Sequence, residues 1–100
     1  MQVQVHSVHF DADAKLLEFI QSKLSKLEQF HDQIIGTEVF LRLDKSDVNE
    51  NKVAEIRMAV PGKELFAKKQ SRSFEESTDV ALEALRKQIR KYKSKLKDNQ

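Results

Sequence analysis

The sequence has no cysteine and no tryptophan, only one proline, and only two glycines, Gly36 and Gly62. Without cysteine the chain can form neither disulfides nor thiolate metal sites, and it has no cysteine nucleophile. Two isolated glycines cannot make a glycine-rich phosphate-binding loop. No apolar run approaches the roughly 20 residues that span a bilayer. These absences exclude several classes of enzyme, and they indicate that a membrane is not a partner.

Candidate catalytic and metal-binding groups are few and poorly spaced. His6, His9 and His31 are accompanied neither by an HExxH motif nor by a serine motif that would suggest a triad. The acidic segment 44–50 lacks the spacing and the glycine of an EF-hand loop, so we interpret it as a solvated turn. We therefore predict no catalytic residue, no metal, no cofactor and no small-molecule substrate, and we do not expect an enzyme.

The length of 100 residues fits one domain with one modest core. Charged residues make up 34% of the chain, against about 25% in an average protein. The apolar residues still fall in periodic groups, which predicts a folded domain over residues 1–97 and a disordered tail over 98–100. The amino-terminal residues lack the basic and apolar stretches of a secretory signal. We therefore expect a cytoplasmic protein.

The net charge of +2 hides an uneven distribution. Between Arg86 and Lys97 lie seven basic residues and no acid, which leaves eleven basic and sixteen acidic residues in the rest of the chain. This polarity suggests attraction to a polyanion. A helix covered in solvated lysines is the alternative interpretation. The helix dipole could favour cations in the last turn, but its influence falls off within about one turn and does not require seven charges.

Alternating apolar residues predict four strands. The first covers residues 3–10, with an irregularity between Val5 and Val8 that suggests a bulge. The others are expected at residues 38–43, 53–60 and 63–70. The polar segment 45–51 predicts a hairpin loop, and Pro61-Gly62 predicts a turn.

Two segments have the periodicity of amphipathic helices. The first can be capped by Asp11 or Asp13, and its predicted core stripe consists of Leu16, Leu17, Ile20, Leu24 and Leu27. The second begins at about Phe74 with a capping box of Ser73 and Glu76, and its predicted stripe consists of Phe74, Ala81, Leu85, Ile89, Tyr92 and Leu96. The order β-α-β-β-β-α predicts an α+β two-layer sandwich, in which a four-stranded, mostly antiparallel sheet carries both helices on one face.

Basic residues from three segments form the predicted RNA-binding site. Helical spacing places Arg86, Arg90, Lys93 and Lys97 in one row beside the apolar stripe, and Lys87, Lys91 and Lys95 on the remaining outer surface. The first helix and the segment before the last helix add Lys15, Lys23, Lys26, Lys68, Lys69 and Arg72 to the site. Lys63 is a further cation of the latter segment. Lysine and arginine on phosphates give affinity that depends strongly on salt and little on sequence. The candidate base-stacking residues are Phe19, Phe30, Phe40, Phe66 and Tyr92; we interpret most of them as core and expect recognition by shape and phosphate.

Two helical segments resemble those of a known family. The first reads Leu16-x-Glu18-Phe19 and then Lys23-x-x-Lys26-Leu27-Glu28-Gln29-Phe30. The second contains Lys87-Gln88 and then Lys91-x-Lys93-x-Lys95-Leu96-Lys97. In order, length and spacing these segments resemble the ribosome hibernation promoting factors, also called ribosome-associated inhibitors or sigma-factor modulation proteins. The resemblance covers essentially the whole chain.

The resemblance implies a fold like that of double-stranded-RNA-binding domains. It also implies a bacterial protein of stress and stationary phase that binds small-subunit ribosomal RNA in the messenger and transfer RNA channel, inhibiting translation by occupancy. Long relatives carry an additional C-terminal dimerisation domain. A chain without that domain is not expected to bridge ribosomes through it, and we expect a monomer away from the ribosome.

Two alternatives remain open at this point. The first is a general double-stranded RNA or nucleic-acid-binding regulator that uses the same residues without ribosome specificity. The second is a regulator that binds another protein, whose affinity would depend little on salt.

Overall fold

A computed structural model describes residues 1–98, with side chains described through Leu96. Its elements are β1 (Gln2–Ser7), α1 (Ala14–Phe30), β2 (Gly36–Leu43), β3 (Lys52–Val60), β4 (Lys63–Ser71) and α2 (Phe74–Asp98). The predicted element order is confirmed. Of the segment expected to be a tail, Asp98 belongs to α2, and residues 99 and 100 lie outside the described part of the chain.

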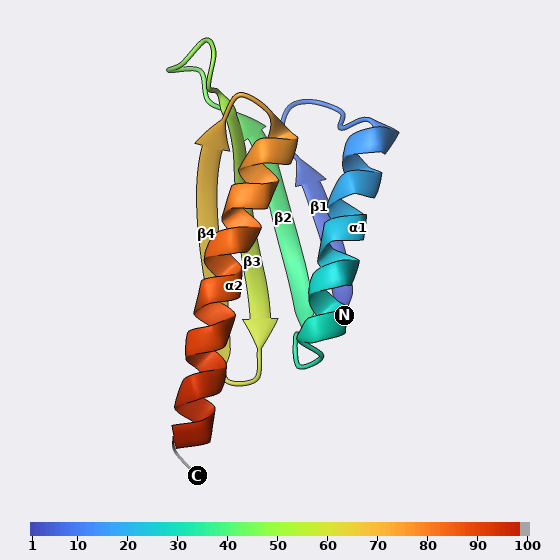
Figure 1. The fold of residues 1–100 in the computed structure, drawn as a ribbon. Coiled ribbons are helices and arrows are strands. Elements are labelled where there is room, and N and C mark those ends of the chain that lie inside the picture. The colour runs from blue at the N-terminus through green and yellow to red at the C-terminus, as the bar shows by residue number, and fades with distance from the viewer. Residues whose placement is uncertain (99–100) are drawn as a thin grey trace.

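The four strands form one sheet in the order β1-β2-β3-β4. Strand β1 pairs with β2 in parallel, whereas the other two pairings are antiparallel. Both helices lie on one face of this sheet and run along it in the same direction (Figure 1). The predicted two-layer α+β sandwich with a mostly antiparallel sheet is therefore confirmed.

The core lies between the helices and the helix-facing side of the sheet. The strand register places Val39, Ile56 and Ala67 side by side across the three neighbouring strands, and all three are buried. Ile20 and Leu85 reach this layer from the helices and are fully buried. This alternation leaves every second residue of each strand on the opposite face, which no helix covers (Figure 1). We call that surface the open sheet face.

Helix α1 begins where the predicted capping chemistry allows. Asp13 is the N-cap, and its Oδ1 accepts a hydrogen bond from Leu16 N at 2.8 Å. The predicted core residues are buried except Leu17, which is 38% exposed. That prediction was wrong because Leu17 lies at the margin of the apolar stripe, beyond the part that the sheet and α2 cover.

Helix α2 begins with only half of the predicted capping box. Glu76 N donates to Ser73 Oγ at 3.0 Å, as expected. Ser73 N, however, donates to Ser71 Oγ at 3.4 Å rather than to the Glu76 carboxylate. Ser71 Oγ also lies 2.7 Å from Ser77 Oγ, which in turn donates to Lys52 O at 2.6 Å. Buried hydroxyl groups thus join the start of α2 to β3 and β4.

The first strand is shorter than the prediction. It ends at Ser7, and His9 adopts a left-handed backbone conformation with φ 65°, which turns the chain away from the sheet. Phe10 therefore leaves the strand and stacks on Phe74, with ring centroids 5.0 Å apart. The irregularity in the alternation marked the end of a strand and not a bulge.

The loop between β2 and β3 is the predicted hairpin loop. Asp44 Oδ1 accepts hydrogen bonds from Ser46 N and Oγ at 2.9 and 2.7 Å, and Asp47 Oδ1 accepts from Asn49 N and Glu50 N at 2.9 and 3.0 Å. These bonds lower the pKa of both carboxyl groups. The carboxylates therefore stabilise the turn by accepting backbone hydrogen bonds, which agrees with the interpretation of segment 44–50 as a solvated turn.

The outer edge of β4 is partly closed by one side chain from α2. Gln88 Nε2 donates to Phe66 O at 2.7 Å, and Phe66 N donates to Gln88 Oε1 at 3.3 Å. The amide thus takes the place of a neighbouring strand at the middle of this edge.

Candidate nucleic-acid interface

The orientation of α2 is fixed by its apolar side. Leu85, Ile89 and Tyr92 are buried against the sheet, and Tyr92 Oη donates a hydrogen bond to Pro61 O at 2.7 Å. The cations of the helix therefore lie on its other sides. Of the seven cations predicted on α2, six have described side chains: Arg86, Lys87, Arg90, Lys91, Lys93 and Lys95. Lys93 is half-buried and the other five are exposed. We call these six residues the α2 basic surface. The Lys97 side chain lies outside the described residues.

One flank of the α2 basic surface faces the end of α1. Lys93 Nζ donates to the carbonyl oxygen of Phe30 at 3.3 Å. His31, the next residue, has a buried Nδ1 with no hydrogen-bond partner among the described residues. Burial lowers the pKa of His31, and the charges of Lys93, Arg86 and Arg90 lower it further. The predicted row beside the stripe therefore converges on the C-terminal end of α1.

The other flank faces β4. Lys91 and Lys95 line a small hollow of about 90 Å³ together with Lys63, and Leu65 and Tyr92 also line it. Lys87 lies one turn before Lys91 on the same side of the helix. Lysine from a second element therefore extends the α2 basic surface onto the sheet edge.

The cations predicted outside α2 are spread over different surfaces. Lys15 and Lys26 are exposed on α1, whereas Lys23 Nζ pairs with Asp79 Oδ1 at 3.3 Å and lies 5.3 Å from the centre of the Phe19 ring. Lys23 thus links the two helices. The structure does not bring all predicted site residues into one continuous patch.

The cations near the end of β4 are divided between the two faces of the sheet. Lys68 pairs in register with Glu55 on the open sheet face. Lys69 follows the alternation of Leu65 and Ala67 and lies on the side of the helices. Arg72 is exposed between β4 and α2. Of Lys68 and Lys69, only Lys69 therefore shares the helical side with the α2 basic surface.

The open sheet face carries aromatic and charged residues that pair with one another. The rings of His6 and Phe40 stack at 4.7 Å, and the Arg57 guanidinium lies 5.3 Å from the centre of the Phe40 ring. Glu55 accepts hydrogen bonds from Arg42 at 3.1 Å and from Arg57 at 3.3 Å. Arg42 and Arg57 on this face are therefore paired with a neighbouring acid. On the α2 basic surface, Arg86 alone among the described side chains has an acid partner, Glu83 Oε2 at 3.8 Å.

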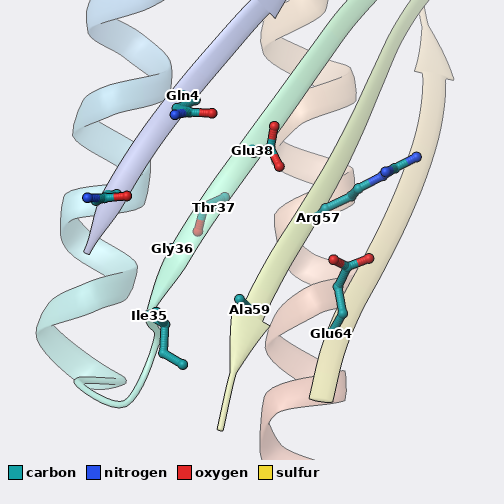
Figure 2. A pocket seen from close by; sticks show the side chains of 9 residues that line it. Gln4, Ile35, Gly36, Thr37, Glu38, Arg57, Ala59 and Glu64 are labelled. Carbon is teal, nitrogen blue, oxygen red and sulfur yellow. The ribbon is translucent and has the colours of Figure 1, made fainter. Parts of the chain in front are cut away.

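A hollow of about 180 Å³ lies at one end of the open sheet face (Figure 2). It forms where Gly36 pairs with Ala59, because two small residues lie side by side in the register. Glu38, Arg57 and Glu64 surround it from three strands (Figure 2). Two carboxylates and one guanidinium do not favour a phosphate, so this hollow is a poorer nucleic-acid site than α2.

The described residues provide neither a membrane-spanning helix nor a metal-binding cluster. No helix in this part of the chain is long and apolar enough to cross a membrane. No three side chains of histidine, aspartate or glutamate in residues 1–98 gather in a way that could hold a metal ion.

Comparison with protein families decides the assignment of the chain. Residues 3–97 match the family described as Sigma 54 modulation protein / S30EA ribosomal protein. The chain belongs to this family. The match spans both helices and all four strands, so the resemblance predicted from the two helical motifs is confirmed for the whole domain. Membership in the Sigma 54 modulation family also supports a binding protein and not an enzyme.

Individual relatives in the Sigma 54 modulation family agree with this assignment. The ribosome hibernation promoting factor of Klebsiella oxytoca is 27% identical over 99 residues, covering 99% of this chain and 100% of the relative. The ribosome hibernation promotion factor of Deinococcus radiodurans is 30% identical over 98 residues, covering 95% of this chain and 51% of the relative.

Solved structures show the same fold. A ribosomal subunit interface protein from Coxiella burnetii superposes with a TM-score of 0.84 at 22% identity, covering 94% of this chain and 99% of that protein. The N-terminal domain of Protein Y from Thermus thermophilus has a TM-score of 0.78 at 18% identity, covering 92% of this chain and 99% of that domain.

Sequence reasoning named Phe30 as a candidate base-stacking residue but missed that Lys93 and His31 lie at the same end of α1. Helical spacing placed Phe30 outside the apolar stripe, which was a usable signal for its exposure. Its contact with Lys93 was not visible, because the two residues are 63 positions apart.

Proposed function

We propose that this protein is a ribosome hibernation factor that binds ribosomal RNA of the small subunit and inhibits translation by occupying the channel of messenger and transfer RNA. The observation that carries the proposal is the α2 basic surface, where six cations lie without an intervening acid. Family membership supports the ribosome as the target, since the relatives are named hibernation factors.

The mechanism requires binding and no chemical step. The cations from Arg86 to Lys95 extend over about 14 Å of helix, at 1.5 Å per residue, which is long enough to meet several phosphates. Each phosphate contact releases counterions and supplies affinity. The helix is held by Leu85 and Ile89 against a sheet, so the bound domain is rigid. A rigid domain in the channel excludes the ligands that normally enter it.

The proposal places the protein in the cytoplasm, as a monomer when it is not bound to a ribosome. Its partners are the small subunit and that subunit's RNA, and its action belongs to stress and stationary phase. A general double-stranded RNA-binding regulator would use the same surface, so the test must compare targets as well as variants.

Sucrose-gradient sedimentation with purified subunits tests the proposal. The binding variant is Arg90→Gln with Lys91→Gln and Lys93→Gln. The matched control is Gln2→Glu with Gln4→Glu and Lys45→Gln, which changes the net charge by the same three units on the open sheet face and its loop. We expect the wild type and the control to remain on small subunits at about 150 mM salt. The binding variant should bind at least about tenfold more weakly, since hydrogen bonds to charged groups contribute about 1.5–3 kcal/mol each.

Three results would contradict the proposal. Equal binding of the wild type to small subunits, large subunits and random duplex RNA at that salt would indicate a general nucleic-acid-binding protein. Normal binding by a folded triple glutamine variant would show that α2 is not the binding surface. Binding that hardly changes between about 50 and 200 mM salt would indicate a protein partner, because six to ten phosphate contacts imply a loss of roughly 10³–10⁵ in affinity.

A further inference from the structure

Phe30, the last residue of α1, is the most exposed aromatic residue among those described, with 73% of its surface accessible. Other rings have partners within the protein. Phe10 stacks on Phe74, Phe40 lies between His6 and Arg57, Phe19 lies under Lys23, and Tyr92 is buried. Phe66, on the open sheet face, is the next most exposed aromatic residue among those described, with 44% of its surface accessible. One exposed apolar side chain is ordinary in a folded protein, so the surroundings of Phe30 decide whether it has a role.

Cations gather at the position of Phe30. Lys93 Nζ contacts its carbonyl oxygen at 3.3 Å. The adjacent His31 lies within the electrostatic influence of Arg86 and Arg90 as well as of Lys93. The negative end of the α1 dipole could favour one nearby cation, but it does not account for three. The end of α1 that carries the exposed ring therefore lies beside the row of cations that faces α1.

We propose that Phe30 stacks on an unpaired nucleobase whose neighbouring phosphates are bound by Arg86, Arg90 and Lys93. The inference rests on the proposed function, in which the ligand is RNA, and it adds the structural class that is recognised. Bases inside a duplex are covered by their neighbours, whereas bases in loops, bulges and ends can be turned out and stacked on aromatic side chains. The expected ligand at this end of the helices is thus a single-stranded or bulged segment.

An apolar surface of a protein partner is a weaker explanation. A hydrophobic contact would have to desolvate the three cations at this end of α1, which is costly unless acids pair with them. Among the described residues only Arg86 has such a partner, Glu83 Oε2 at 3.8 Å. A nucleotide satisfies both requirements with one ligand, since its base covers the ring and its phosphate pairs with the cations. On the open sheet face, by contrast, Phe66 lies beside Arg57, which is already paired with Glu55. Phe66 therefore provides a matched control with an exposed ring on a neutral background.

Affinity for small subunits, measured at physiological salt, tests the inference with Phe30→Leu and Phe66→Leu. Leucine keeps an apolar side chain at each position and removes the aromatic ring. Phe30→Leu should bind roughly 5- to 150-fold more weakly, the range that corresponds to loss of one base–aromatic stack. Phe66→Leu should bind like the wild type, and Phe30→Tyr should restore most of the affinity. Thermal unfolding of all variants should be similar because both side chains are on the surface.

A single tryptophan gives an independent readout, since the natural chain contains none. Phe30→Trp should show quenched indole emission when small subunits are added, because a nucleobase stacks on the ring. Phe66→Trp should show no such quenching. Wild-type affinity of Phe30→Leu, or equal losses for the two leucine variants, would overturn the inference. Failure of the wild type itself to bind small subunits would instead overturn the proposed function, so the two failures are distinguishable.

Discussion

The open sheet face and the outer face of α2 differ in how their charged residues are arranged. On the open sheet face, Glu55 pairs with both Arg42 and Arg57, and Glu38 lies 3.1 Å from His6. On α2, cations follow one another four residues apart, as in Arg86 and Arg90. Like charges at this spacing destabilise a helix by about 0.2–0.5 kcal/mol per pair.

This difference indicates where a ligand is required. The sheet face is balanced without a partner, because neighbouring strands supply opposite charges. The helix face accumulates repulsion that an anionic ligand would remove. An unfavourable arrangement in the free protein thus becomes a source of affinity in the complex.

The largest expected effect is a loss of stability caused by a substitution in the core, which lies between α2 and the sheet. Leu85 is fully buried between α2 and the sheet, so Leu85→Ala should lower the free energy of unfolding by about 2–5 kcal/mol. Leu96→Ala on the same helix is the matched control, since Leu96 is 48% exposed, and it should change stability by about 0.5 kcal/mol or less. Urea unfolding measures both. Similar losses for the two variants would show that α2 is not anchored as the structure indicates.

The second prediction concerns the salt dependence of binding. Each phosphate-bound cation that is removed lowers the slope of log affinity against log salt by about one. The variant with glutamine at positions 90, 91 and 93 should therefore reduce the slope by about three. The charge-matched variant at positions 2, 4 and 45 should keep the wild-type slope. An equal change in both slopes would mean that only net charge matters and that the two faces do not differ.

The third prediction uses His31 as a sensor of the basic row. Its pKa is lowered in the free protein by burial and by Lys93, Arg86 and Arg90. Phosphates that neutralise these cations should raise the pKa, so RNA binding should take up a proton and strengthen as pH falls below about 6.5. NMR titration of the His31 ring, free and bound, measures this, with His6 on the open sheet face as the reference. An unchanged His31 pKa in the complex would place the RNA elsewhere.

The same histidine has the opposite effect on folding. Its pKa is lower in the folded state than in the unfolded state, so the unfolded chain binds the proton more readily. The contribution of His31 to stability is therefore complete above about pH 6.5 and declines as pH falls through the folded pKa. A His31→Gln variant should show a weaker loss of stability in acid than the wild type.

The smallest effect is expected on the open sheet face. Glu55→Gln removes the partner of Arg42 and Arg57, and it should cost about 1 kcal/mol or less because these pairs are near the surface. Glu64→Gln, on the same face, should have almost no effect on stability. Neither variant should weaken RNA binding. A clear loss of binding with Glu55→Gln would show that the balanced face also contributes to the interface.

Periodicity alone predicted most of this fold. The alternation of apolar residues in β3 and the apolar stripe of α1 were sufficient to predict these two elements, because each pattern indicates which side of the element is buried. The wrong predictions of burial concern residues at the margin or at the end of a helix. Leu17 lies at the margin of its stripe, and Leu96 lies near the end of α2, which extends past the sheet (Figure 1). Whether such positions are covered depends on the length and angle of neighbouring elements, which local sequence does not record.

For the candidate site, too, the sequence predicted the arrangement within one element but not the contacts between elements. The two rows of cations on α2 followed from helical spacing, because both rows belong to one element. The position of Lys68 on the open sheet face required the strand register. The meeting of Phe30 with Lys93 required the packing of the two helices. Contacts between distant segments were therefore the part that sequence could not supply.

The contact between Gln88 and the edge of β4 has a consequence for assembly. A sheet with two free edges can add copies head to tail without limit, because each added molecule presents a new edge. The Gln88 amide occupies the middle of the β4 edge, so another molecule that pairs along this edge has to displace it. Edge-to-edge association between two β1 strands closes on itself at a pair. Two hydrogen bonds from one side chain thus oppose open-ended growth through the sheet.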